Sequence, residues 1–296
     1  MEGRFTTEHL KQLHRIFFIS REIDRLEREF IKQGIAHFHV SGAGHESTAL
    51  LNEFLQDNDW LHLHYRDKAL MLARGMPIRE FFSSLLATGN SHSAGRQMSA
   101  HLSSRALNIT SIVGPVGNNA LHSVGVAATL KDKAGLPIAI CCVGDGTTQQ
   151  GEFVEAVAEA VRSQYPVVFI IEDNNFSIST RTSKQTFFDL PDGPAASFYG
   201  VEIIRADGDD LHAAREAFHK AVRHSRNNRK PSIIHLNLER LTDHTNADDQ
   251  KTYRTQDEIE AGSVHDPLIN LRAALLEAGV DNEALEAIEK ELSAEV

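Results

Sequence analysis

The sequence contains little cysteine, no excess of basic residues and no long apolar run. Its two cysteines are the neighbours Cys141 and Cys142. Neighbouring residues of a strand point to opposite faces of a sheet, so a disulfide between them is excluded by geometry. We therefore expect two free thiols, which suits a reducing compartment.

Charge and hydropathy exclude two further classes of partner. Acidic residues outnumber basic ones by 41 to 30, and no run of Lys and Arg interrupts this balance, which argues against nucleic acid. No stretch approaches the ~20 apolar residues that span a bilayer, and the polar segment 1–7 lacks the apolar region of a signal peptide. We expect a soluble, cytoplasmic protein with no nucleic-acid or membrane partner.

The chain is long and apolar enough to bury a large core. Its 296 residues are 41% hydrophobic, and we expect a single domain over 1–296. An amphipathic helix is predicted over 8–32, with Thr7 as N-cap and Gly34 as its stop. Its apolar face could pack on the chain's own core or on another subunit. Two closing helices are predicted within 268–293, and the last reaches almost to the terminus without a capping glycine, which leaves open a longer polypeptide.

The middle of the chain alternates short apolar runs with helical patterns. Strands are predicted over 137–143, 167–171, 201–204 and 232–238, and helices over 68–74, 79–87, 152–162 and 211–224. This alternation favours parallel strands joined by right-handed crossovers. The sequence therefore predicts an α/β fold, a doubly wound, mostly parallel sheet with helices on both faces. Ligands of such sheets bind beyond the carboxyl ends of the strands.

An anion site is predicted where the first of these central strands ends. That strand is followed by the segment Gly144-Asp145-Gly146-Thr147-Thr148-Gln149-Gln150-Gly151-Glu152 and then by a helix. Glycines allow close approach of an anion, and the free N–H groups of a helix start attract negative charge. The Asp145 carboxylate could hold a hard ion such as Mg²⁺ beside a phosphate. Alone, the motif also fits an ordinary turn in which Asp145 is a local cap.

A second polar cluster follows the next strand, as Glu172-Asp173-Asn174-Asn175-Phe176. Adjacent parallel strands lie only ~5 Å apart, so Asp145 and Asn174 can reach one ion from neighbouring strand ends. The helix start would then meet a diphosphate. The two clusters together predict a site for Mg²⁺ and a diphosphate.

A Gly-Asp-Gly turn followed one βαβ unit later by an Asn pair resembles the signature of thiamine diphosphate enzymes. Over most of its length the chain resembles alpha subunits of the decarboxylating component of 2-oxo acid dehydrogenase complexes, most of all branched-chain 2-oxo acid enzymes. The resemblance implies the thiamine diphosphate-binding fold. Segments in the family's order are Gly44-His45-Glu46, Tyr65-Arg66-Asp67, Gly95-Arg96-Gln97-Met98 with His101, Leu107-Asn108-Ile109, Ile178-Ser179-Thr180 and 240–254.

The resemblance implies a set of ligands for Mg²⁺ and the cofactor. Asp145, Asn174 and the backbone carbonyl of Phe176 would hold Mg²⁺. Arginine meets phosphate oxygens in pairs through its planar fork. The cofactor-binding residues would be Tyr65, Arg66 and Arg240 at the diphosphate, Gly144, Gly146 and Thr147 in the turn, Val116 at the aminopyrimidine ring, and His244. His244 would also be catalytic, in proton handling or acyl transfer to a lipoyl group.

The resemblance also implies that the chain works only with partners. A beta subunit, in an assembly of two alpha with two beta or as a fused beta half, would supply the glutamate that activates the cofactor. The lipoyl domain of the acyltransferase component would accept the acyl group. The substrate would be a small branched-chain 2-oxo acid. Pyruvate and acetoin remain alternatives, because one methylene changes binding by only ~1–3 kcal/mol.

The chain departs from the family's pattern in three respects. Asp173 stands where an Asn is usual, which we expect to weaken cofactor affinity. A structural potassium site is not predicted, because its positions hold Val113, Asn118 and Asn119. Thr245 replaces a regulatory phosphoserine, so kinase control is not inferred.

Other interpretations of the same residues stay open. Tyr65-Arg66 could form a surface ion pair with Asp67, and His244 could be an ordinary surface residue. The chain could also be a metal-dependent phosphohydrolase that uses Asp145, or a non-catalytic alpha-like subunit. The polar loop 241–252 is expected to be mobile until a cofactor or partner orders it.

Overall fold

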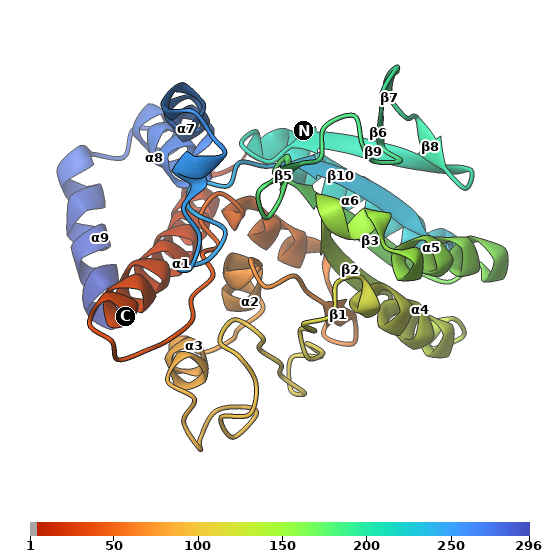
Figure 1. Cartoon of the computed structure of the whole chain (residues 1–296), viewed down its shortest axis with the longest axis horizontal. Coiled ribbons are helices and arrows are strands. Elements are labelled where there is room, and N and C mark those ends of the chain that lie inside the picture. The colour runs from red at the N-terminus through yellow and green to blue at the C-terminus, as the bar shows by residue number, and fades with distance from the viewer. Residues whose placement is uncertain (1–4) are drawn as a thin grey trace.

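A mostly parallel six-stranded sheet runs through the computed structural model, which describes residues 5–296 (Figure 1). The first four residues of the polar segment 1–7 lie outside the described range. Neighbouring strands pair in parallel except at one edge, where β8 runs antiparallel to β9. In spatial order the strands are β1 (Trp60–His62), β2 (Ala139–Gly144), β3 (Val167–Asp173), β10 (Ser232–Asn237), β9 (Val201–Asp207) and β8 (Ser197–Phe198).

The four predicted strands are confirmed as β2, β3, β9 and β10, whereas both edge strands were not predicted. β1 and β8 are only three and two residues long, too short to show an alternating pattern of their own. They form because a neighbouring strand offers unpaired backbone groups. Two small hairpins were also not predicted: β4 (Phe176–Ser177) with β5 (Thr180–Arg181), and β6 (Asp189–Leu190) with β7 (Gly193–Pro194).

Helices cover both faces of the sheet, as predicted. Alternate residues of β2 point to opposite sides, so Ile140 and Cys142 belong to one apolar cluster and Cys141 and Val143 to the other. Cys141 and Cys142 are both free, as expected. The first cluster contains side chains of α1 (Thr7–Lys32), α2 (Lys68–Ala73) and α6 (Leu211–Asn228), and the second those of α4 (Asn118–Leu130) and α5 (Gly151–Ser163).

The long N-terminal helix α1 packs on elements of its own chain. Its buried face contacts α2, α8 (Pro267–Glu277) and α9 (Asn282–Glu295), and Figure 1 shows α8 and α9 beside it. The predicted N-cap was wrong by one residue: the hydroxyl of Thr6, not Thr7, accepts a hydrogen bond from the His9 N–H at 3.2 Å. Past its end, Gly34 has a φ of 71°, as a helix stop requires.

The remaining helices are α3 (Ile78–Leu85) and α7 (Gln256–Gly262). α4 and α7 were not predicted. α4 is rich in small residues and has a weak apolar stripe, and α7 is short and depends on a capping box between Thr255 and Glu258. Between residues 5 and 296, no helix combines the length and apolar character needed to cross a membrane.

The register of β2 and β3 brings the two predicted polar motifs together. Gly144, the last residue of β2, lies opposite Glu172 of β3. Asp145 and Asn174 therefore leave the sheet at the same edge from neighbouring strands. Beyond β10, the Leu238 N–H donates to the Asp173 carbonyl at 2.7 Å, so the chain leading to Arg240 departs from this edge too.

Candidate functional site

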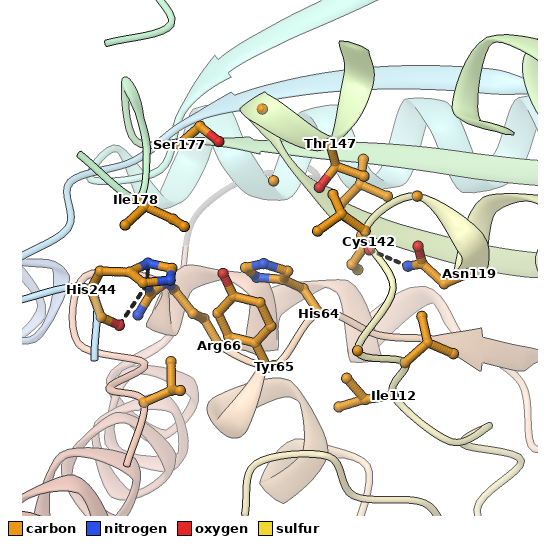
Figure 2. A pocket seen from close by; sticks show the side chains of 18 of the residues that line it. His64, Tyr65, Arg66, Ile112, Asn119, Cys142, Thr147, Ser177, Ile178 and His244 are labelled. Carbon is orange, nitrogen blue, oxygen red and sulfur yellow. Dashed lines mark hydrogen bonds between the residues drawn. The ribbon is translucent and has the colours of Figure 1, made fainter. Parts of the chain in front are cut away.

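A cavity of about 270 Å³ opens at the carboxyl ends of β1, β2 and β3. Its lining contains ten of the predicted site residues: Tyr65, Arg66, Val116, Gly144, Asp145, Gly146, Thr147, Asn174, Phe176 and His244. In Figure 2, Tyr65 and His64 lie between His244 on one side and Thr147 on the other. Segments far apart in the sequence therefore meet where the strand topology places a ligand site.

Asp145 and Asn174 reach the cavity from adjacent strand ends, and both are buried. The Thr182 hydroxyl donates to the Asp145 carboxylate. Burial raises the pKa of Asp145 to about 6, and the charge of Asp173 adds to the shift. The Asn174 Oδ1 is buried and has no hydrogen-bond partner within residues 5–296. Buried polar atoms are normally partnered, and an amide oxygen and a carboxylate are the kinds of ligand that a hard cation takes.

Gly146 is required by packing against Ser177. A Cβ at this position would lie 2.3 Å from the Oγ and 2.5 Å from the Cβ of Ser177. Only glycine lets the turn pack against β4. The turn itself is a short 3₁₀ segment, Asp145–Gln149, and α5 begins after it at Gly151. The helix predicted over 152–162 is thereby confirmed as α5, one residue longer at each end.

Arg66 and His244 are in direct contact at the cavity. The Arg66 Nη1 donates to the Ser41 carbonyl at 2.6 Å, and its Nη2 donates to the Nδ1 and the carbonyl of His244 at 2.9 and 3.1 Å. Burial lowers the pKa of His244 to about 4, and the charges of Arg66 and Arg240 lower it further. The imidazole is therefore neutral at pH 7, and with Nδ1 as acceptor its proton is on Nε2.

Arg66 does not form a surface ion pair with Asp67. Both residues are buried, and the Asp67 carboxylate accepts from the backbone N–H of His64 at 2.8 Å instead. Tyr65 packs against His64, with ring centroids 3.9 Å apart. The open alternative of a surface pair is therefore wrong, and His244, half-buried in the cavity, is not an ordinary surface residue either.

Arg240 is the predicted cofactor residue that does not line the cavity. Its Nη1 donates to the Ile178 carbonyl at 2.8 Å and its Nη2 to the Tyr253 hydroxyl at 2.7 Å. Ile178 and Val116 stand at the cavity with 55% and 57% of their surfaces exposed. Arg240 thus sits one residue behind the cavity wall and would have to exchange these bonds to reach a ligand.

The loop 241–252 makes several contacts with the rest of the chain. Asp248 accepts from the His244 N–H at 2.9 Å and from the Tyr253 hydroxyl at 2.5 Å. Asn246 forms two hydrogen bonds with the backbone of His39, at 2.8 and 3.2 Å. These bonds hold His244 beside Arg66, and the expected mobility of the loop stays a prediction.

The unusual carboxylate of Asp173 points away from the cavity. One oxygen faces the Nε2 of His235 on β10 at 2.7 Å, and the other accepts from the Asn175 N–H at 2.8 Å. The Asp173 carboxylate, which departs from the family's pattern, is therefore paired with neighbouring groups. Its charge nevertheless raises the pKa of Asp145. Weakened cofactor affinity stays a prediction.

Several lining residues were not predicted from the sequence. Polar ones are His64 and Ser177, and apolar ones are Phe38, Val40, Leu63, Ile112 and Cys142. His64 has a usable signal, because it directly precedes Tyr65-Arg66. The apolar ones have none, since only the packed structure determines which apolar side chains border a cavity rather than the core.

Comparisons with known proteins show which proteins the chain is similar to. The family model described as "Dehydrogenase E1 component" matches residues 14–296. The "Pyruvate dehydrogenase E1 component subunit alpha" of Mycoplasma genitalium is 32% identical over 296 residues, which cover 98% of this chain and 80% of that protein. The "2-oxoisovalerate dehydrogenase subunit alpha" of Bacillus subtilis is 28% identical over 284 residues, covering 95% and 86%. Its mitochondrial counterpart in Mus musculus is 28% identical over 276 residues, covering 92% and 62%.

Proposed function

The chain belongs to the dehydrogenase E1 component family as a 2-oxo acid dehydrogenase alpha subunit, and from this premise we propose that it binds Mg²⁺ and thiamine diphosphate and decarboxylates a branched-chain 2-oxo acid. A beta subunit, in an assembly of two alpha with two beta, completes the site. The acyl group passes to the lipoyl domain of the acyltransferase component. A cytoplasmic location is part of the same proposal.

The observation that carries the proposal is the meeting of Asp145 and Asn174 in one cavity. Asp145, the unpartnered Oδ1 of Asn174 and the carbonyl of Phe176 would hold Mg²⁺, an ion that prefers oxygen ligands. Tyr65 and Arg66 would bind the diphosphate. The turn residues Gly144, Gly146 and Thr147, with Val116 and Arg240, would complete the cofactor contacts.

Thiamine diphosphate, when bound, supplies a carbon nucleophile and an electron sink for decarboxylation. The residues of this chain would position the cofactor and the substrate and polarise the reacting groups. Arg66 orients His244 through Nδ1, which leaves the Nε2–H as a proton donor at the cavity. The apolar wall around Ile112 and Val40 keeps water from the reacting end.

The same apolar wall supports a branched-chain substrate. Phe38, Val40, Leu63 and Ile112 line the cavity, and an aliphatic side chain gains from burial against such a surface. Pyruvate is the second candidate, because relatives at 31–32% identity are named as pyruvate dehydrogenase subunits. Values of kcat/KM for 3-methyl-2-oxobutanoate and pyruvate, measured with the assembled enzyme, decide between them. A preference for pyruvate would reject the branched-chain assignment.

Calorimetric titration with thiamine diphosphate, with and without Mg²⁺, tests the cofactor site. We expect Mg²⁺-dependent binding, strongest with the beta subunit present. Asp145→Ala should weaken it by at least about 100-fold, because the site loses its charged ligand. Asp192→Ala, at an exposed position, is the control and should bind like wild type. Unchanged affinity in Asp145→Ala would defeat the site assignment. A phosphohydrolase would instead release phosphate as the isolated chain, and a non-catalytic subunit would not bind the cofactor.

The role of His244 needs a separate variant. His244→Ala should keep Mg²⁺-dependent cofactor binding but slow acyl transfer to a lipoyl domain by about 10²–10⁴-fold, the usual contribution of a positioned proton donor. Single-turnover transfer assays with the assembled enzyme measure this step. Transfer at the wild-type rate would remove His244 from the catalytic residues.

A further inference from the structure

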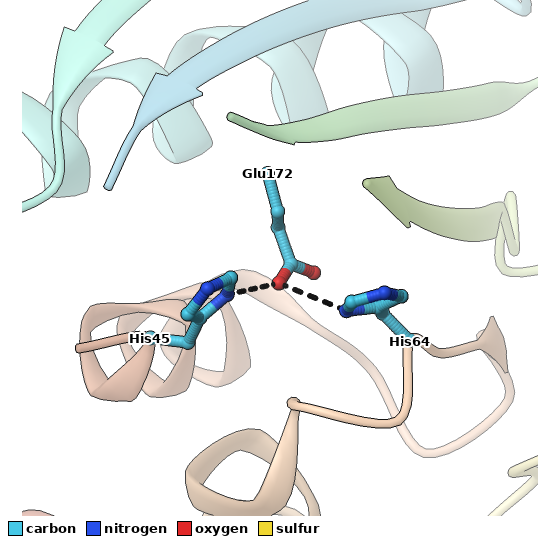
Figure 3. Close-up of side chains that lie close together, drawn as sticks. All are labelled: His45, His64 and Glu172. Carbon is cyan, nitrogen blue, oxygen red and sulfur yellow. Dashed lines mark hydrogen bonds and ion pairs between the residues drawn. The ribbon is translucent and has the colours of Figure 1, made fainter. Parts of the chain in front are cut away.

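Behind the cavity, two fully buried side chains connect β3 to the predicted metal-binding amide. The Nδ1 of His45 lies 2.6 Å from the Oε2 of Glu172. The Nε2 of the same ring lies 3.3 Å from the Nδ2 of Asn174. Figure 3 shows His45 and His64 facing Glu172 from opposite sides. None of the proposed cofactor contacts uses His45 or Glu172.

The trio His45, His64 and Glu172 has the composition of a metal site, but its spacing is that of a hydrogen bond. A tetrahedral ion ~2.0–2.1 Å from each ligand holds the ligand atoms roughly 3.3 Å apart. The 2.6 Å between His45 and Glu172 is much shorter and fits a charge-assisted N–H···O bond. His64 is at 3.5 Å from the same oxygen.

The direction of each hydrogen bond follows from chemistry. A carboxylate can only accept, so the single proton of a neutral His45 ring is on Nδ1, which donates to Glu172. The lone pair is then on Nε2, facing Asn174. Only the NH₂ group of the amide can donate to that lone pair. The amide oxygen must therefore point the other way, and the Asn174 Oδ1 is indeed the atom left buried and unpartnered in the described structure.

We propose that Glu172 and His45 are positioning residues that hold the Asn174 amide with its oxygen, not its NH₂, toward the cation. An asparagine amide can turn over, and the flipped form would present two N–H donors to the metal. The chain Glu172 to His45 to Asn174 makes the flipped form unfavourable, because it would set the amide oxygen against the Nε2 lone pair. Partners of metal ligands commonly orient them in this way.

The inference rests on the proposed Mg²⁺ site, so the experiment separates the two. The full chain, purified with its beta subunit, is titrated with thiamine diphosphate in Mg²⁺ and in EDTA. His45→Phe keeps a ring but removes both hydrogen bonds. His45→Gln keeps a donor for Glu172 and an acceptor for Asn174. His14→Phe is the matched control, since His14 is equally buried but bonds to Glu289 at 3.1 Å, between α1 and α9.

We expect His45→Phe to weaken the Mg²⁺-dependent part of the affinity by about 10–100-fold, while affinity in EDTA and the Tm of the cofactor-free protein move no more than in His14→Phe. His45→Gln should restore most of the Mg²⁺ dependence. With Mn²⁺ as an electron paramagnetic resonance probe, His45→Phe should bind the ion more weakly by the same factor. If His45→Phe does not fold, His45→Met serves the same comparison.

A double variant makes the test specific to orientation. In Asn174→Asp either orientation of the carboxylate presents an oxygen to the cation, so adding His45→Phe should no longer weaken Mg²⁺ affinity. Wild-type Mg²⁺ dependence in His45→Phe overturns the inference and leaves the proposed function standing. Wild-type protein without any Mg²⁺ dependence overturns the proposed function, and the inference with it.

Discussion

Two buried polar clusters differ in how completely their polar atoms are paired. The helix cluster, Asp24, Glu27, His39 and Lys68, lies between α1 and α2. The Lys68 ammonium contacts both carboxylates, and His39 lies 3.3 and 3.2 Å from them. Within residues 5–296, every buried side-chain nitrogen and oxygen of this cluster has a partner.

The strand-end cluster, His45, Asp67, Glu172 and Asn174, lies at the ends of β2 and β3 and contains no lysine. In the described part of the chain, three of its oxygens lack a partner: Asp67 Oδ1, Glu172 Oε1 and Asn174 Oδ1. Burial and the neighbouring Glu172 charge raise the pKa of Asp67 well above its usual value.

The difference teaches how to tell a structural cluster from a binding one. Burying a charge or a polar atom costs free energy unless a partner compensates it. In the helix cluster, the buried charges of Asp24 and Glu27 are compensated by Lys68 and His39 of the same cluster, which joins three segments of the chain. The strand-end cluster leaves the Asn174 Oδ1 unpaired at the cavity, which is expected where a ligand supplies the missing partner.

The largest expected effect on stability comes from a variant that disrupts the helix cluster. Lys68→Met should lower the free energy of unfolding by about 3–5 kcal/mol, because it removes the ammonium that contacts both buried carboxylates and leaves only His39 beside them. Urea unfolding at pH 7 measures it. Lys220→Met, which removes an exposed pair with Glu202, should change stability by no more than about 0.5 kcal/mol. Equal effects in the two variants would contradict the comparison.

The strand-end cluster should show the reverse pattern. Asn174→Ala should leave the free energy of unfolding of the cofactor-free protein within about 1 kcal/mol of wild type, since its Oδ1 makes no bond and only the 3.3 Å bond of its Nδ2 to His45 is lost. Mg²⁺ affinity in the presence of thiamine diphosphate should fall by at least about tenfold. Asn228→Ala, at the end of α6, is the control for both measurements. A large loss of stability without loss of Mg²⁺ affinity would make Asn174 a structural residue.

The smallest expected effect is a pH dependence within the helix cluster. Burial alone lowers the pKa of His39, but hydrogen bonds to Asp24 and Glu27 outweigh it and raise the pKa above 6.5. The protonated ring therefore stabilises the fold fully below pH 6.5, and this contribution is lost as the pH rises through the folded pKa. The stability difference between wild type and His39→Gln should thus be larger at pH 6 than at pH 9.

His14 provides a control of opposite sign. Burial lowers its pKa despite the nearby Glu289, so wild type should lose stability relative to His14→Gln as the pH falls below 6.5. Urea unfolding at several pH values compares the two histidines directly. Parallel pH profiles for the two variants would show that the pairing of His39 has no influence on its protonation.

Much of the site could be predicted because its parts are local signals. The strand before Asp145 and the strand before Asn174 are continuous apolar runs, and a parallel sheet brings such ends to one edge. What could not be predicted depends on contacts distant in sequence. Arg240 has a side chain that can bind phosphate, but its guanidinium donates hydrogen bonds to Ile178 and Tyr253 instead. No sequence motif indicates these two contacts.

The sequence by itself determined the fold class, the family, and ten of the residues that line the cavity, because hydrophobic periodicity and short motifs are properties of neighbouring residues. Only the tertiary structure decided which polar atoms are paired. His45 belongs to the short motif Gly44-His45-Glu46. Its role, however, depends on Glu172 and Asn174, which lie on either side of its ring. Hydrogen-bond direction follows from three-dimensional juxtaposition, and a linear pattern does not contain it.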